Sequence, residues 1–190
     1  MGWQAEEFGS SHEGRAGAVL ADGSEPEPVY FDGATMAGQY LSDWWVYNGK
    51  FGAPRATHLR GSCSCSWRGE NLYPIDWAQV AESRYSADTS GPCDDWGRHI
   101  SEVESRSVPL PAGLGDLLEQ LNDQLADLAA EAPLAALKAV AALERTAADI
   151  GLMAADNVKA DDLTWEEIGT GLGLTEKDAR SRLSRYSFRR

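Results

Sequence analysis

The stretch TWEEIGTGLGLTEKDARSRLSRYSFRR, residues 164–190, decides how the C-terminal part of the chain folds. Thr164 is a favoured N-cap residue, and Glu167 three positions later can return the hydrogen bond, so a helix is expected to begin here with a capping box. Gly173 is expected to end that helix, because glycine adopts the left-handed backbone conformation at little cost. Thr175 then caps a second helix.

Both predicted helices carry an apolar stripe at helical spacing. The stripe consists of Trp165, Ile168 and Leu172 in the first helix and of Ala179, Leu183 and Tyr186 in the second. Two short helices joined by a glycine turn are typical of a helix-turn-helix, whose second helix enters the major groove of DNA. The alternative interpretation is a helical hairpin that only packs within the chain or docks on another protein.

The second predicted helix is basic, in contrast to the rest of the chain. Residues 175–190 carry six cationic and two acidic side chains, a net charge of +4, whereas the 190-residue chain has a formal net charge of −13. Contact with phosphate groups is the simplest reason for a basic helix on an acidic protein. The acidic remainder predicts weak non-specific affinity for DNA and leaves room for a protein partner.

The segment WEEIGTGLGLTEKDARSRL, residues 165–183, resembles the helix-turn-helix of sigma-factor region 4 and, more closely, a terminal helix-turn-helix of actinomycete regulators. The shared features are a tryptophan that opens the first helix, an isoleucine–glycine pair within it, and a leucine–glycine–aliphatic turn. This resemblance implies binding of double-stranded DNA.

We expect one group of side chains to face bases or the groove and a second group to contact phosphates. The first group is Thr175, Lys177, Arg180 and Ser181, and the second is Arg182, Arg185, Arg189 and Arg190.

Composition is that of a globular chain without a membrane span. The chain is 43% hydrophobic and 25% charged, and no apolar run approaches the 18 residues that a transmembrane helix needs. The N-terminal residues lack the basic and apolar regions of a signal peptide, and three cysteines are an odd number for a disulfide framework. We therefore expect a cytoplasmic protein.

Changes in composition divide the chain into four predicted segments. These are a flexible tail at 1–28, a tryptophan-rich α+β domain with a small antiparallel sheet at 29–108, a linker and leucine heptad helix at 109–133, and a helical DNA-binding domain at 134–190 with its helix-turn-helix at 164–186. The predicted fold class is thus α+β followed by an all-α part. Within the second segment we expect strands at 29–31, 43–47, 55–68 and 71–75, and helices at 34–41, 76–83 and 94–104.

The leucines of the third segment follow a heptad pattern. Leu114, Leu118, Leu121, Leu125 and Leu128 are spaced alternately by four and three residues. They either pack against a second helix at 134–150 within the chain or form the seam of a homodimer. A dimer would suit a protein that reads two DNA half-sites.

The stretch HLRGSCSCSW, residues 58–67, is the second feature with chemical meaning. Thiolates and imidazoles are the ligands that Zn²⁺ prefers in tetrahedral sites. The preferred ligand set is Cys63, Cys65, Cys93 and His99, with His58 as the substitute for Cys93; His12 is set aside because it lies in the predicted tail. The alternatives are buried free thiols beside a core histidine, or a redox sensor.

This region also resembles a short element of actinomycete proteins. That element is a cysteine-x-cysteine-glycine-tryptophan-arginine strand followed by a helix with tryptophan or alanine and then histidine. Here Cys63-Ser-Cys65-Ser66-Trp67-Arg68 and Trp96-Gly-Arg-His99 match, with Ser66 in place of the glycine. By its residue types, the resemblance implies metal binding.

Catalytic motifs are absent from the sequence. It contains no Walker loop, dinucleotide glycine fingerprint, HExxH or GxSxG pattern. We therefore expect no enzyme but a dimeric, zinc-containing regulator that binds DNA. The alternative is an interaction module that docks on RNA polymerase or another regulator.

Overall fold

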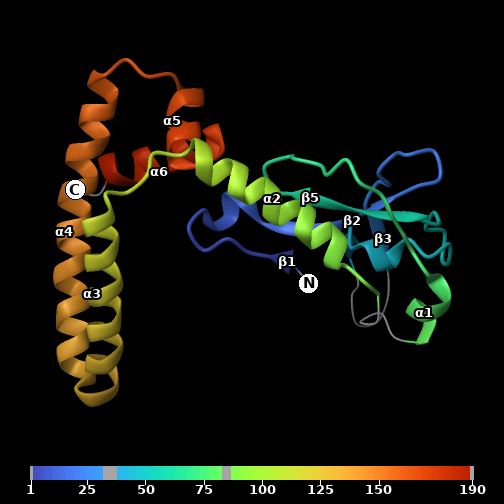
Figure 1. Cartoon of the computed structure of the whole chain (residues 1–190), viewed down its shortest axis with the longest axis horizontal. Coiled ribbons are helices and arrows are strands. Elements are labelled where there is room, and N and C mark those ends of the chain that lie inside the picture. The colour runs from blue at the N-terminus through green and yellow to red at the C-terminus, as the bar shows by residue number, and fades with distance from the viewer. Residues whose placement is uncertain (1, 32–37, 83–86, 189–190) are drawn as a thin grey trace. The chain divides into compact units, whose positions relative to one another are not determined.

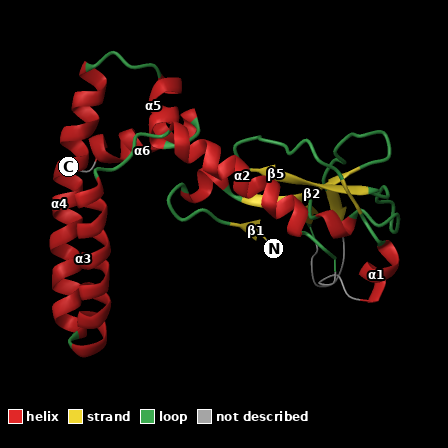
Figure 2. Cartoon of the chain, in the orientation of Figure 1, coloured by secondary structure: helices red, strands yellow, loops and turns green. Residues whose placement is uncertain are grey.

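A computed structural model describes residues 2–31, 38–82 and 87–188 of the chain. The chain divides into two compact units, Met1–Ser105 and Arg106–Arg190, each of which is described by itself. The first unit contains all the described strands and the second consists of helices (Figure 2). This arrangement confirms the predicted fold class, and the division falls close to the predicted boundary at residue 108.

The first unit is built on a four-stranded antiparallel sheet in the order β1-β2-β5-β6. Its strands are β1 (Gly2–Trp3), β2 (Gly14–Val19), β5 (His58–Cys63) and β6 (Tyr73–Pro74). β2 and β5 form its centre over six residue pairs, from Gly14 opposite Cys63 to Val19 opposite His58. A separate two-stranded sheet pairs β3 (Val29–Phe31) with β4 (Gln39–Leu41).

The helices of the first unit are short, apart from one. They are the 3₁₀ turns η1 (Gly9–His12) and η2 (Trp44–Val46), and the α-helices α1 (Trp77–Glu82) and α2 (Ser90–Arg106). Trp44, Val46 and Tyr47 pack with Leu59 and small residues of β2 in the main core. Trp44 is therefore a core residue, and Trp45 and Trp77 pack partly buried at the edge of the core.

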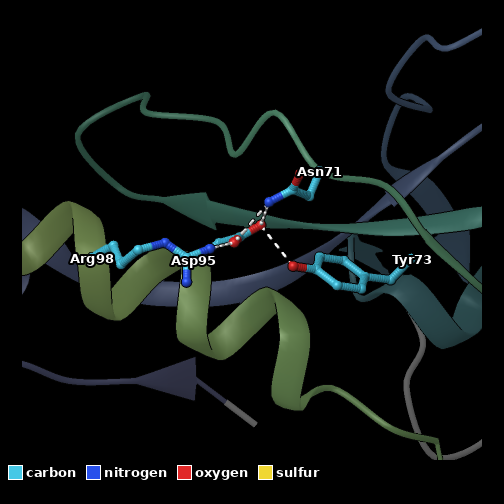
Figure 3. A network of polar contacts seen from close by, with 4 residues as sticks. All are labelled: Asn71, Tyr73, Asp95 and Arg98. Carbon is cyan, nitrogen blue, oxygen red and sulfur yellow. Dashed lines mark hydrogen bonds and ion pairs between the residues drawn. The ribbon is translucent and has the colours of Figure 1, made fainter.

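One face of the β2–β5 pair is made of unusually small side chains. Gly14, Ala16 and Gly61 share this face with Cys63, because side chains alternate between the two faces of a strand. A Cβ added at Gly61 would lie 2.7 Å from the carbonyl oxygen of Pro92, which belongs to α2. The small residues therefore let α2 lie directly against the sheet (Figure 3).

The prediction of a flexible tail at 1–28 is wrong. Residues 2–19 contain β1, η1 and β2, and β2 is a central strand. Phe8 and His12 are buried, with 3% and 5% of their surface exposed. The small residues of β2 do not show the alternation of large apolar side chains by which a strand is recognised, so this segment looked unstructured in the sequence.

Three other local predictions need correction. The predicted strand at 43–47 is the 3₁₀ turn η2, and residues 39–41 of the predicted helix at 34–41 form β4 instead. The remainder of that helix lies mainly outside the described residues. The predicted helix at 94–104 begins earlier, because α2 starts at Ser90.

The second unit contains four α-helices. α3 (Ala112–Glu131) and α4 (Pro133–Ala160) form a long antiparallel hairpin (Figure 1), and α5 (Trp165–Leu172) and α6 (Glu176–Phe188) pack together and with α4. Their common core consists of Ala155, Ile168, Leu174, Ala179 and Leu183, with Trp165 and Tyr186 packed at its edge.

The turn between α5 and α6 has the predicted local structure. Thr164 and Glu167 form the capping box, and Gly173 adopts a left-handed conformation with φ of 62°. Gly169 is required by close packing, since a Cβ there would lie 3.0 Å from the carbonyl oxygen of Leu174. One detail differs: Leu172 is 39% exposed, and Leu174 in the turn supplies the buried side chain instead.

The leucine helix α3 packs against α4 within the chain, as one of the two predicted arrangements required. However, none of its residues is fully buried. Large apolar side chains of the hairpin remain exposed, including Leu117, Leu118, Leu134, Leu137 and Ile150. In the part of the chain that the structure describes, no helix is both long and apolar enough to cross a membrane.

The capping box of α5 provides a test of the local structure at the start of this helix. Thr164→Ala removes the hydroxyl that accepts the Glu167 amide hydrogen at 3.2 Å, and it should destabilise α5 by about 1 kcal/mol. Hydrogen exchange should show that the free energy of opening of the α5 amides is lower by this amount. The control Thr170→Ala makes the same change within α5 and should have little effect; an equal effect in both variants would contradict the capping role.

Candidate metal centre and helix-turn-helix surface

Four side chains of the first unit converge as a group that can hold a metal ion. The ligand atoms of His12, Cys63, Cys65 and His99 all lie within 4.8 Å of one another. Nδ1 of His12 lies 3.3 Å from Nε2 of His99 and 3.6 Å from Sγ of Cys63. Sγ of Cys65 lies 3.3 Å from Nε2 of His99.

These separations match the edges of a tetrahedral zinc site. With Zn–S bonds of about 2.3 Å and Zn–N bonds of about 2.0–2.1 Å, the edges are about 3.3 Å between two nitrogens and about 3.6 Å between nitrogen and sulfur. The nitrogen–nitrogen distance of 3.3 Å agrees with the first value, and the two nitrogen–sulfur distances of 3.6 and 3.3 Å are close to the second. Two thiols and two imidazoles are also a common zinc ligand set.

A tight turn at the end of β5 brings the two cysteines together. The Cys63 amide donates to the carbonyl oxygen of Trp67, and the Ser66 amide donates to that of Cys63, each at 3.0 Å. Ser66 has a φ of 77°, in the region that favours glycine. The actinomycete element that this region resembles has glycine at this position, and glycine would adopt this conformation without strain.

The N-terminal segment is fastened to the same turn. The Ser64 hydroxyl donates to the carbonyl oxygen of Ser10 and accepts from the Glu13 amide, both at 2.9 Å, and the Ser64 amide donates to the carbonyl oxygen of Glu13. These bonds hold His12 over the cysteines, with Phe8 edge-on to its ring. His12 is thus a fixed part of the site although it precedes Cys63 by 51 residues.

A buried carboxylate fixes α2, the helix that carries the candidate ligand His99. Asp95 is 4% exposed and accepts hydrogen bonds from the Asn71 amide at 3.0 Å and the Tyr73 hydroxyl at 3.0 Å, and it pairs with Arg98 (Figure 3). Burial and the Asp95 charge raise the pKa of Tyr73, so its hydroxyl remains a donor. Because His99 follows Asp95 by one helical turn, this network sets the position of its ring.

The ring of His99 is also held by stacking. The Trp67 indole lies parallel to it, with ring centroids 4.5 Å apart and an angle of 8° between the planes. Trp67 comes from the turn that carries the cysteines, whereas His99 comes from α2. Stacking therefore connects the two elements directly beside the ligand atoms.

The pKa shifts of Cys63 and His99 favour metal binding, whereas the shift of Cys65 opposes it. The Cys65 thiol donates to Cys63 and lowers the pKa of Cys63, while burial acts in the opposite direction. The same hydrogen bond and burial raise the pKa of Cys65. Burial lowers the pKa of His99 and keeps its imidazole neutral. Since metals bind thiolate and neutral imidazole, binding of a cation here would release protons from the cysteine thiols.

The structure brings together three of the four predicted ligands, Cys63, Cys65 and His99, and places His12 where Cys93 was expected. Cys93 lies inside α2, six residues before His99, so the two side chains point about 120° apart around the helix. His58 lies elsewhere, with Nδ1 2.9 Å from the Thr57 hydroxyl. The proposed substitution of His58 for Cys93 therefore also fails.

The predicted DNA-contacting residues form the outer face of α6. Lys177, Arg180, Ser181 and Arg185 are exposed, opposite the buried Ala179 and Leu183, and Arg182 is partly buried at the edge of this face. Arg189 and Arg190 lie outside the described residues. Thr175 is engaged as a cap, because its hydroxyl donates to the Asp178 carboxylate and accepts from the Asp178 amide.

The guanidinium of Arg180 is the most constrained cation of this face. It lies 4.8 Å from the centroid of the Trp165 ring and 3.7 Å from the Glu176 carboxylate, an exposed pair one turn away. Among the described residues, no carboxylate forms an ion pair with Lys177, Arg182 or Arg185. Lys177 and Arg185 are thus directed to solvent, whereas Arg180 pairs with Glu176 of the same helix.

Comparison of the chain with protein families, curated proteins and solved structures found no match.

The identity of the fourth ligand can be tested directly. His12→Ala should abolish the tetrahedral cobalt(II) spectrum and stoichiometric zinc binding, because it removes one of four ligands. Cys93→Ser and His58→Ala should leave both unchanged. The assignment would be overturned if Cys93→Ser lost the cobalt spectrum while His12→Ala retained it.

Proposed function

We propose that the chain is a DNA-binding transcriptional regulator that reads the major groove with α6. The observation that carries this proposal is the exposed cationic face of α6 opposite an apolar three-helix core, in an otherwise acidic chain. A recognition helix needs this combination, because one face must be fixed by packing while the other reaches bases and phosphates. The resemblance to the sigma-factor region 4 and actinomycete helix-turn-helix units points in the same direction.

The positions of the side chains on α6 suggest which of them contact bases and which contact phosphates. Lys177 and Ser181 lie one turn apart near the N-terminal half of the helix, where recognition helices contact base edges. Arg185 lies a further turn on and suits a phosphate contact. Trp165 restrains Arg180 from the preceding helix, which reduces the entropy that this side chain would lose on binding.

We further propose that the regulator is a homodimer through the α3–α4 hairpin. The exposed leucines of α3 and α4 leave apolar surface that a two-helix hairpin cannot cover by itself. α3 carries five acidic and no basic residues, whereas α4 carries three of each. Packing α3 against α4 of a second copy therefore avoids the repulsion that two facing α3 helices would suffer.

The metal in the first unit is, in this proposal, one zinc ion with a structural role. All four positions of a tetrahedral site are taken by protein side chains, which is the arrangement of structural zinc, whereas catalytic zinc keeps one position open. The ligands come from three separate segments, so the ion would hold the N-terminal segment, the β5 turn and α2 together.

Binding of DNA fragments from the host genome tests the main proposal. Arg180→Ala combined with Arg185→Ala should weaken retardation by about 10- to 100-fold, and loss of the contact assigned to Arg185 should reduce the salt dependence of binding by about one phosphate contact. The control Lys50→Ala with Arg55→Ala removes the same charge from exposed positions of the first unit and should retain most of the affinity. Equal retardation of both double variants and the unmodified protein would refute the proposal.

A second candidate function is docking on RNA polymerase or another regulator, and the observation that favours it is the exposed apolar surface of the hairpin. The two functions differ in their response to salt. Phosphate contacts give a steep loss of DNA affinity as salt rises, whereas an apolar interface depends on salt much less. Co-purification with polymerase and no affinity for DNA would favour docking.

The structural role of zinc predicts a local response to chelation. Six of the seven tryptophans lie in the first unit, so tryptophan fluorescence reports mainly on this unit. A strong chelator should remove about one equivalent of zinc and unfold this unit, because metal binding and folding are coupled, while the helical circular dichroism of the second unit persists. Chelation without change in fluorescence would exclude a structural zinc ion.

A further inference from the structure

Trp96 is a buried residue beside the candidate metal centre, and its indole N–H has no hydrogen-bond partner among the described residues. Its side chain belongs to α2 and is 7% exposed. Within the described residues, the Nε1–H of Trp96 is one of three buried side-chain polar groups without a hydrogen-bond partner. A buried donor without an acceptor costs free energy, so such a group calls for an explanation.

The position of the indole is fixed by the absence of a side chain at Gly14. A Cβ added to Gly14 would lie 2.5–2.6 Å from three indole atoms, Nε1 among them. The ring therefore rests directly on the backbone of β2, with its nitrogen over the place where the Gly14 side chain would begin. Any other residue at position 14 would push the ring away.

The register of the sheet places Cys63 beside that nitrogen. Gly14 and Cys63 are direct partners across β2 and β5, and directly paired residues project to the same face with Cβ atoms about 4.5–5.5 Å apart. An indole nitrogen over Gly14 is thus within reach of the Cys63 sulfur.

We infer that Trp96 is a positioning residue of the metal centre, whose indole N–H donates a hydrogen bond to the Cys63 sulfur when that sulfur is a metal-bound thiolate. The inference rests on the proposed metal site. A metal-bound thiolate is a strong acceptor, so it would give the buried indole N–H the partner that it otherwise lacks.

The hydrogen bond has two expected consequences. It orients the Cys63 sulfur, and it stabilises the sulfur lone pairs that donate to the metal. Loss of a group that supports a ligand in this way usually lowers metal affinity by about 10- to 100-fold. Because Trp96 and His99 both belong to α2, a single helix would supply one ligand and the support of another.

Cobalt(II) substitution of the full chain separates this role from simple packing. Trp96→Phe keeps an aromatic ring but removes the N–H donor. The thiolate-to-cobalt charge-transfer band should shift to lower energy, because the sulfur lone pairs rise in energy, and zinc affinity should fall about tenfold or more. The control Trp44→Phe alters a buried tryptophan of the main core and should leave the band in place.

The outcomes distinguish this inference from the metal proposal. No cobalt binding by the unmodified chain would overturn both. Cobalt binding with the same band in Trp96→Phe would overturn the role of Trp96 and leave the metal site intact.

A measurement on the unmodified protein covers the case in which Trp96→Phe does not fold. In the cadmium-113 form, the Trp96 indole proton should show scalar coupling to the metal through the Cys63 sulfur. A folded, metal-loaded protein in which the other ligands couple but the Trp96 proton does not would also overturn the inference.

Discussion

The first unit depends on the close approach of α2 to the β2–β5 pair, which is possible because Gly14 and Gly61 have no side chains. This contact brings one turn of α2, from Asp95 to His99, against the sheet. Asp95 then anchors the helix through Asn71 and Tyr73, while His99 reaches the two cysteines. Larger residues on this face would separate the helix from the strands, and the metal ligands would no longer meet.

The two short helices α5 and α6 and the turn between them could be predicted from the sequence because their determinants are local. The Thr164–Glu167 capping box and the left-handed Gly173 depend on residues a few positions apart, and the structure contains both. The error at Leu172 is also local in origin: α5 is short, so its last turn points out of the core and the turn residue Leu174 takes the buried position. The DNA contacts themselves stay a prediction.

The candidate metal site could be predicted only in part, because it is assembled from distant segments. Cys63, Cys65 and His99 were recognisable by residue type, but the choice of the fourth ligand depended on the tertiary structure. His12 was excluded with a segment whose pairing with β5 spans more than 40 residues and whose small side chains give no periodic pattern. Cys93 remains as a candidate once His12 is assigned to a tail, but α2 begins at Ser90, and within the helix Cys93 points away from His99.

The long separation between β2 and β5 has a consequence for synthesis on the ribosome. β2 is made early, yet its central partner β5 emerges only after about forty further residues, and α2 later still. Until then the glycine- and alanine-rich strand has no surface on which to fold, since nonlocal pairings form late. Binding of the proposed zinc ion would accordingly be among the last steps in the folding of this unit, after His99 has left the exit tunnel.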